Sequence, residues 1–244
     1  MSQNQASIGI ITGLRREAEC LSPRAVWLDE VAQHDQVPPV IVASVGGRAA
    51  GVRQAVRQMA HLGCKGIVSF GIAAGLDRVA VPGDLVLGAT VELPTGDLLK
   101  SNGPWRTQLR HMLKIDKIPA AQGPILGVDE VITSSLGKIR LHAISAAIAA
   151  DMESHVVALE AKNAQLPFLV VRAVADPFDR AIPSAAYDAL GADGRPLIGR
   201  VLRRLLVRPH QLPGLIGVAR DTSKAMKALK TVGSLDGGRF GFLS

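Results

Sequence analysis

The stretch Phe168-Leu169-Val170-Val171-Arg172-Ala173-Val174-Ala175, which stops at Asp176, decides the fold class of this 244-residue chain. Mostly branched apolar residues follow one another without polar alternation, which is typical of a parallel strand covered on both faces. In an open α/β sheet, ligands bind in the crevice beyond the carboxyl ends of such strands. Asp176 is therefore a candidate acid or base, although an Asp directly before Pro177 is equally typical of a simple cap on the next segment.

A second stretch, Ala150-Asp151-Met152-Glu153-Ser154, lies upstream of this strand. Acidic residues suit the first turn of a helix, and an amphipathic pattern continues to Asn163, so the sequence predicts a helix from Asp151 to Asn163. The two stretches together predict carboxylates from both at the edge of one sheet.

The rest of the chain alternates between strand and helix patterns. Such alternation predicts an α/β fold: a three-layer sandwich with a mixed, mainly parallel central sheet flanked by helices. The segment 94–104, which contains Gly96 and Gly103 between two prolines, is typical of a loop or lid. The other predicted strands are 8–12, 40–45, 66–70, 84–91 and 125–128, and the other helices are 49–62 and 136–147.

The composition is that of a folded domain, with 48% apolar and 20% charged residues. This excludes disorder of the whole chain. Cys20 and Cys64 lie far apart without metal-ligand spacing, as a reducing compartment permits. No stretch approaches about eighteen continuous apolar residues, and the polar start does not resemble a signal peptide, so we expect a cytoplasmic protein.

The net charge of +7 is concentrated at the C-terminal end, where ten Lys or Arg residues face two acids from Arg195 onward. Within it, the apolar residues of 197–206 fall on one helical face and Arg200, Arg203, Arg204 and Arg208 fall largely on the other. We therefore expect a folded α/β domain over 1–194 and a basic amphipathic helical extension over 195–244.

This extension is either a docked terminal helix with its arginines in water or a helix on an anionic membrane surface, which would place the protein at the inner face of the membrane. Nucleic acid is disfavoured because the tail has few aromatic side chains for base stacking. Pro209, Pro213, Gly214 and Gly217 predict a break before a second helical stretch over 220–232, and the glycines near the end predict frayed residues.

Glycines follow three predicted strands, at Gly13, at Gly46-Gly47, and at Gly71 and Gly75. A glycine lets the backbone approach a ligand closely, so this pattern predicts a polar ligand held mostly by backbone groups. The spacing is not that of a dinucleotide fingerprint, and no metal-ligand cluster is present in the sequence, so neither a nicotinamide cofactor nor a metal is expected. Arg15, Arg16 and Glu17 follow Gly13; they either face the same crevice or form the solvated first turn of a helix.

Five motifs, in this order and spacing, resemble the nucleoside phosphorylase and methylthioadenosine/S-adenosylhomocysteine nucleosidase family over roughly residues 8 to 180. They are Ile8-Gly9-Ile10-Ile11 with Glu17, Ser44 to Ala50, Gly71 to Leu76 with Pro82-Gly83-Asp84, Asp151-Met152-Glu153, and Val171 to Asp176. Motifs around Asp176-Pro177, Asp193-Gly194-Arg195 and Arg208-Pro209 are similar to the hopanoid-associated phosphorylase branch, which is linked to release of adenine from adenosylhopane.

The resemblance implies a role for each matching residue. Asp176 would protonate the purine as the catalytic acid, and Glu17 would orient an attacking water. Glu153 would accept hydrogen bonds from the ribose hydroxyls, with Met152 packed against the sugar. Further substrate contacts are implied for Gly71, Ile72, Ala73 and Ile132. Ile72 stands where many relatives have a small hydroxyl residue, and Val131-Ile132 stands in place of a segment with a stacking aromatic residue.

The resemblance leaves the nucleophile open. Glu17 favours hydrolysis, whereas Gly13, Arg15, Arg16 and Arg48 could hold phosphate as a co-substrate for phosphorolysis. No other cofactor is implied. The implied partner is an adenine nucleoside, either lipid-linked or small, and the chain is expected to form a homo-oligomer. The alternatives are a methylthioadenosine/S-adenosylhomocysteine nucleosidase and a non-catalytic nucleoside-binding module.

Overall fold

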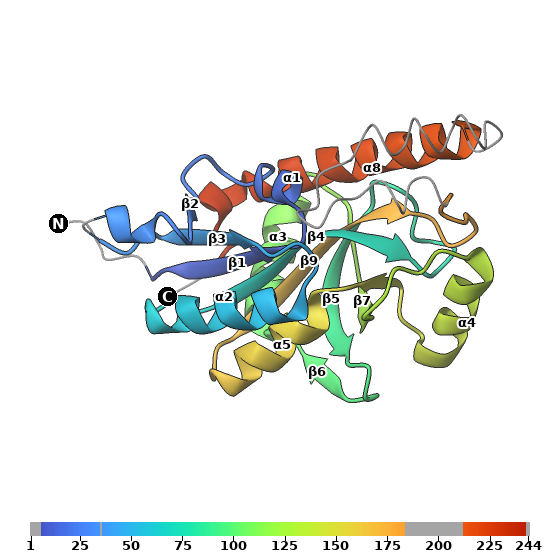
Figure 1. Cartoon of the computed structure of the whole chain (residues 1–244). Helices are drawn as coiled ribbons and strands as arrows, with labels where there is room; N and C mark the ends of the chain where they lie inside the picture. The colour runs from blue at the N-terminus through green and yellow to red at the C-terminus, as the bar shows by residue number, and fades with distance from the viewer. Residues whose placement is uncertain (1–5, 35, 184–211, 243–244) are drawn as a thin grey trace.

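The computed structural model describes residues 6–34, 36–183 and 212–242 and has one nine-stranded sheet between two layers of helices (Figure 1). The strand order is β2-β3-β1-β4-β8-β7-β5-β6, and β9 pairs with both β4 and β5. The strands are β1 (Ile8–Thr12), β2 (Val26–Trp27), β3 (Val40–Ser44), β4 (Ile67–Gly75), β5 (Leu85–Glu92), β6 (Leu98–Lys100), β7 (Ala120–Gly127), β8 (Ala149–Asp151) and β9 (Phe168–Asp176).

The sheet is mixed and mainly parallel. Strands β1, β2, β3, β4 and β9 pair in parallel, as do β5, β7 and β8. Among the described strands, antiparallel pairing joins β4 to β8 and β5 to β6 and β9. Strands β4, β8, β7, β5 and β9 thereby close into a ring. The predicted fold class is confirmed, and the apolar run that ends at Asp176 is the buried strand β9.

Helices cover both faces of the sheet (Figure 1). On one face, α2 (Ala49–His61) and α5 (Ser154–Asn163) lie side by side and share a core with Val170 and Val174 of β9. On the other face, α1 (Arg15–Ala18), α3 (Gly103–Ile115) and α8 (Leu212–Gly233) share a core with Val171 and Ala173. The other helices among the described residues are α4 (Ser135–Ser145) and the short 3₁₀ helices η1 (Val31–Gln33) and η3 (Leu235–Gly238).

The predicted helix over 151–163 is shorter than expected, because Asp151 ends strand β8 and α5 begins at Ser154. Asp151 nevertheless serves the start of α5: its Oδ1 accepts hydrogen bonds from the backbone N–H groups of Glu153 at 2.8 Å and Ser154 at 2.7 Å. An acceptor at this position satisfies donors that have no partner within the helix.

The segment 94–104 is not a lid. Its residues Leu98–Lys100 form β6, which pairs with β5, and α3 begins at Gly103. The side chain of Asn102 caps α3 by accepting a hydrogen bond from the backbone N–H of Trp105 at 2.9 Å. An Asn followed by Gly and Pro is a helix-start signal that the loop prediction overlooked.

The C-terminal prediction is wrong at two points. Pro213, Gly214 and Gly217 do not break the second helical stretch, because all three lie inside α8, which begins at Leu212. Proline is tolerated in the first turn of a helix, where its missing N–H would have no partner. The segment around Gly237, Gly238 and Gly241 is not frayed, because Phe240 is fully buried and its carbonyl accepts a hydrogen bond from the Trp105 indole N–H at 3.0 Å. These residues pack with α8 on the sheet core.

Two predictions about the extension fall outside the described residues: the amphipathic segment 197–208 and the domain boundary after residue 194. The division into two parts, the cytoplasmic location and the membrane-surface role stay predictions. In the part of the chain that the structure describes, every helix is too short or too polar to cross a membrane.

Candidate active site

A fully buried arginine gathers acidic and hydroxyl side chains at the centre of the sheet. Arg172 Nε lies 3.0 Å from Asp151 Oδ2, and Nη2 lies 3.5 Å from Glu153 Oε2. Nη2 also donates hydrogen bonds to the hydroxyls of Ser69 at 2.6 Å and Ser154 at 3.1 Å. We call these five residues, from β4, β8, β9 and the start of α5, the arginine cluster. A buried cation of this kind is stable only where carboxylates neutralise it, so the cluster fixes the position of Glu153.

Glu17 joins this cluster from helix α1. Its Oε2 accepts a hydrogen bond from the backbone N–H of Leu14 at 2.7 Å, and its Oε1 accepts one from Ile72 at 2.8 Å. The residue is 2% exposed. Burial raises the pKa of Glu17, while the charge of Arg172 and the backbone hydrogen bonds act in the opposite direction. Glu17 thus connects the loop after β1 to the middle of β4.

Glycines make room for these carboxylates. A side chain at Gly71 would place its Cβ 2.7 Å from Glu17 Oε1 and 2.6 Å from Arg172 Nη1. At Gly13, a Cβ would lie 2.5 Å from Glu153 Oε1. Gly47 also faces this oxygen, at 3.5 Å from its would-be Cβ. Gly13, Gly47 and Gly71 therefore surround acidic side chains, rather than an empty anion site. Gly71 lies inside β4, which extends to Gly75, and not after the strand as the sequence predicted.

Glu153 holds its proton unusually tightly. Burial raises its pKa to about 8; Arg172 lowers it, and the neighbouring charges of Asp151 and Glu17 raise it further. Burial is the main cause, and the single guanidinium of Arg172 does not offset both burial and the two neighbouring carboxylates.

This pKa predicts how stability changes with pH. Because the folded-state pKa lies above the value of 4.5 for an ordinary Glu, the folded state keeps a proton that the unfolded state releases. The stabilisation is complete below about pH 4.5 and is lost as pH rises through about 8, at roughly 1.4 kcal/mol per pH unit. Urea denaturation between these values should show this slope in the wild type and a flatter one in Glu153→Gln. The same pH dependence of the unfolding free energy in both proteins would contradict this prediction.

Asp176 lies at the end of β9, where its carboxylate pairs with the ammonium group of Lys138 from α4. Its side chain is 13% exposed, and Oδ1 has no hydrogen-bond partner among the described residues. Burial raises the pKa of Asp176, and the charge of Lys138 opposes this rise. Asp176 pairs in the sheet with Ala74, two residues beyond Ile72, which corresponds to about 7 Å along β4. Asp176 therefore lies along the same strand as the Ile72 amide that holds Glu17.

The other predicted substrate contacts lie around these groups. Met152 is half-buried beside Glu153, and Ile72 is half-buried where its amide meets Glu17. Ala73 is buried in the core. Ile132 packs against the apolar group of Leu76, Leu126, Ala147 and Ala150.

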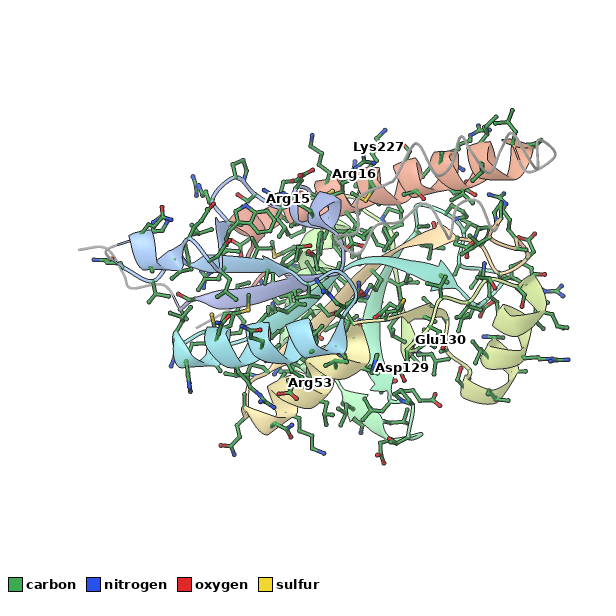
Figure 2. All side chains as sticks on the ribbon, in the orientation of Figure 1. Arg15, Arg16, Arg53, Asp129, Glu130 and Lys227 are labelled. Atoms are coloured by element: carbon green, nitrogen blue, oxygen red, sulfur yellow. The ribbon has the colours of Figure 1, made fainter. Side chains whose placement is uncertain are left out.

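The cations predicted to hold phosphate lie at the surface. Arg15 and Arg16 are exposed on α1 (Figure 2), and Arg48 is exposed just before α2. The guanidinium of Arg15 lies 4.8 Å from the ring centre of Trp27, and its Nε lies 3.8 Å from Glu19 Oε1. Within residues 6–34, 36–183 and 212–242, no group of three or more His, Cys, Asp or Glu residues is placed to hold a metal ion.

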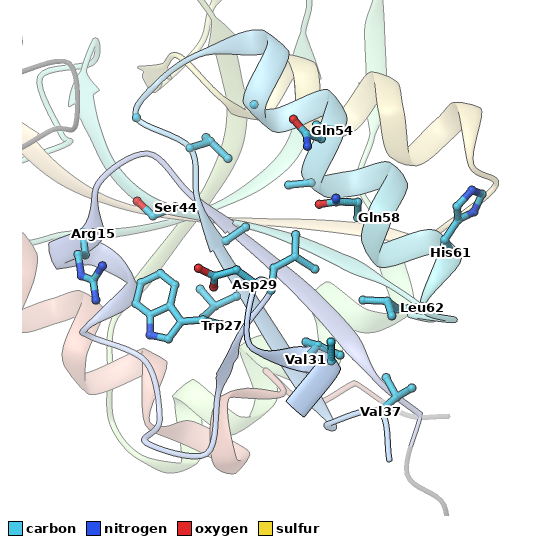
Figure 3. Close-up of a pocket in the computed structure, with 18 of the residues that line it drawn as sticks. Arg15, Trp27, Asp29, Val31, Val37, Ser44, Gln54, Gln58, His61 and Leu62 are labelled. Atoms are coloured by element: carbon cyan, nitrogen blue, oxygen red, sulfur yellow. The ribbon is translucent and has the colours of Figure 1, made fainter. Parts of the chain in front are cut away.

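An open groove runs along the β2 edge of the sheet (Figure 3). Trp27, Val31 and Leu62 contribute apolar walls, and Gln54, Gln58 and His61 contribute polar ones from α2. The groove reaches the loop between β3 and α2, which contains Gly46 and Arg48. Gly47 of this loop faces Glu153, whereas Glu17, Glu153, Arg172 and Asp176 do not line the groove itself.

Comparison with known protein families assigns the chain to one of them. A model described as the phosphorylase superfamily matches residues 15–206, a span that holds Glu17, the arginine cluster and Asp176. The chain belongs to the phosphorylase superfamily. The family-level resemblance seen in the sequence is thereby confirmed, whereas the hopanoid-associated branch remains a prediction.

Solved structures share the fold of this phosphorylase superfamily member. A Helicobacter pylori 5′-methylthioadenosine/S-adenosylhomocysteine nucleosidase variant with 5′-methylthioadenosine in its active site is 16% identical, with a TM-score of 0.64, covering 93% of this chain and 97% of that one. For H. pylori futalosine hydrolase the identity is 15%, the TM-score 0.65 and the coverage 93% and 97%. Streptococcus pyogenes S-adenosylhomocysteine nucleosidase is 16% identical, with a TM-score of 0.64, and the match covers 95% of this chain and 98% of that one. No curated protein sequence matches the chain.

Proposed function

We propose that this member of the phosphorylase superfamily is a nucleosidase that cleaves the N-glycosidic bond of an adenine nucleoside with water as the nucleophile. The observation that carries the proposal is the position of Glu17 beside Glu153. The buried carboxylate of Glu17 accepts hydrogen bonds from the backbone N–H groups of Leu14 and Ile72. A carboxylate has lone pairs left to accept a proton from water after these two bonds. Its raised pKa makes it a stronger base than an ordinary Glu.

Asp176 acts as the acid in this proposal. It transfers its proton to an imidazole nitrogen of the adenine, so that the base leaves as a neutral molecule when the bond to the sugar breaks. A carboxyl group needs a raised pKa to hold that proton near neutral pH, and burial at the end of β9 supplies it. Oδ1, which is buried and has no hydrogen-bond partner among the described residues, is the atom that would donate this proton.

Glu153 binds the sugar. Its carboxyl group hydrogen-bonds the ribose hydroxyls, and its oxygen atoms place partial negative charge beside the cationic sugar that forms as the bond breaks. Water then adds to the sugar carbon and gives its proton to Glu17, which balances the proton that Asp176 gave to adenine. The 5′-methylthioadenosine bound in the active site of the similar H. pylori nucleosidase supports an adenine nucleoside as the ligand class.

Phosphate is the less favoured nucleophile. The amides of Leu14 and Ile72, which an anion at the strand ends would need, already donate to Glu17. Arg15 is engaged with Trp27 and Glu19 at the surface. A phosphate would have to displace the Glu17 carboxylate or be repelled by it.

For the substrate, we propose adenosylhopane, which the resemblance to the hopanoid-associated branch implies. The groove beside the β3–α2 loop supports a bulky apolar substituent on the sugar, because it is open to the surface and has apolar walls. Methylthioadenosine is the alternative, and it would leave the groove unfilled.

The test is adenine release from adenosylhopane and from methylthioadenosine, each with and without phosphate, in ¹⁸O-labelled water. We expect phosphate-independent release, label in the free ribosyl product, and turnover of adenosylhopane above that of methylthioadenosine. A sugar 1-phosphate product would mean that the enzyme catalyses phosphorolysis and not hydrolysis. Faster turnover of methylthioadenosine would overturn the substrate assignment, and no release from either would contradict the proposed activity.

A further inference from the structure

Lys138 is a fully buried cation on α4 that none of the proposed catalytic steps uses. Its ammonium group pairs with Asp176 Oδ2 and donates hydrogen bonds to the carbonyls of Pro177 at 2.7 Å and Arg180 at 2.8 Å. A lysine ammonium has three donors, so these three acceptors satisfy it completely. Lysine is rarely buried without such pairing, which points to a built contact.

This contact holds both the side chain of Asp176 and the loop that follows it. Pro177 and Arg180 are fixed by the same ammonium group that pairs with the carboxylate. On its other side, the loop is fixed by an ion pair between Arg180 and Asp221 of α8, and Lys224 of α8 lies 3.6 Å from Asp221. The carboxyl group is therefore held between α4 and α8.

We propose that Lys138 is a positioning residue for Asp176: it orients the carboxyl group with Oδ1 free and sets the pH range over which that group keeps its proton. This inference rests on the proposed nucleosidase activity. It assigns Lys138 no contact with the substrate, only an action through Asp176.

The charges around Asp176 give the direction of the effect. Lys138 from α4 and Arg180 from the loop favour the ionised carboxyl group, while Asp221 from α8 and burial favour the protonated one. The exposed Asp179 lies close enough to act on Lys138. Burial alone would make Asp176 hold its proton too tightly to donate it well, and the Lys138 cation counteracts this.

The experiment compares the pH dependence of kcat/KM for adenine release in the wild type, Lys138→Gln and Lys138→Arg. Gln keeps donors for the two carbonyls but removes the charge, and Arg keeps the charge. Activity falls at high pH as Asp176 loses its proton. We therefore expect the alkaline limb of K138Q to move up by about 1 to 3 pH units. Its kcat should fall about 10- to 100-fold because the acid is less well oriented.

K138R should keep the limb within about one pH unit of the wild type and recover part of the rate. A rate loss in K138Q without a shift of the limb, or with a downward shift, would reduce Lys138 to a structural contact and overturn the inference. If K138Q does not fold, Lys138→Met, which fills a similar volume without charge, takes its place.

A second measurement does not depend on turnover. A ¹³C carboxyl NMR titration, with the Asp176 signal assigned from the Asp176→Asn variant, should show a higher pKa in the uncharged variant than in the wild type. If the wild type releases no adenine, the proposed function fails while this titration still decides the role of Lys138. An unchanged Asp176 pKa would overturn the inference whatever the activity.

Discussion

Replacement of Asp176 by Asn is expected to slow adenine release about 1000-fold, within the range that a positioned general acid contributes. The amide has almost the same shape and can still accept a hydrogen bond from Lys138, so the geometry at the end of β9 should survive. It has no acidic proton to give, however, and adenine would have to leave as an anion. Nucleoside binding should change by no more than about 3-fold, since the arginine cluster and Glu17 are untouched.

Single-turnover release and calorimetric binding of a non-cleavable adenine nucleoside separate these two effects. Asp179→Asn is the matched control, because Asp179 is an exposed acid in the loop that follows β9. Its rate should stay close to that of the wild type. An unchanged rate in D176N would remove Asp176 from the mechanism. A slow rate with equally weakened binding would mean that Asp176 holds the nucleoside rather than protonates it. Binding of the nucleoside by the wild type without any release of adenine would favour a non-catalytic nucleoside-binding module.

The elements that could be predicted from the sequence are those whose signal is local. Strands β1 and β9 and helix α2 are found almost at the predicted bounds, because an unbroken apolar run or a repeating helical face is contained in the segment itself. Strand β8 was not predicted, because a segment of three residues is too short to show a periodic pattern. Its pairing with β4 and β7 depends on segments far away in the sequence. The burial of Phe240 likewise depends on Trp105 and Phe70, far away in the chain.

The same distinction applies to the candidate site. Glu17 and Glu153 lie close to Gly13, Gly47 and Gly71, but the side chains that hold the two carboxyl groups were not predicted. Arg172 is the one charged residue in the apolar run 168–175. A charge at this position indicates a buried ion pair, and the sequence analysis did not use that signal. Lys138 had no comparable signal, since a lysine on a short helix is usually solvated and its burial depends on the loop after β9.

Replacement of Arg172 by Met is expected to destabilise the protein by about 3–5 kcal/mol, the cost of leaving buried charges without their partner. Met fills most of the volume, so the loss reports charge rather than a cavity. Without the guanidinium, Asp151, Glu153 and Glu17 face one another in a buried site, and the hydroxyls of Ser69 and Ser154 lose their shared donor. Adenine release should fall by more than about 1000-fold, because both the sugar-binding carboxylate and the base lose their arrangement.

The pH dependence of this loss identifies its cause. Arg172 lowers the pKa of Glu153 and of Glu17, so its removal raises both and extends the range over which folding requires bound protons. Urea denaturation should therefore show a larger difference between wild type and R172M near about pH 8 than near about pH 5. Arg15→Met is the control: Arg15 Nε lies 3.8 Å from Glu19 Oε1, and the two side chains are 56% and 60% exposed, so its removal should cost less than about 1 kcal/mol. A loss in R172M no larger than in this control, or one independent of pH, would mean that Arg172 does not hold the carboxylates in place. The site would then depend on the backbone hydrogen bonds of Glu17 instead.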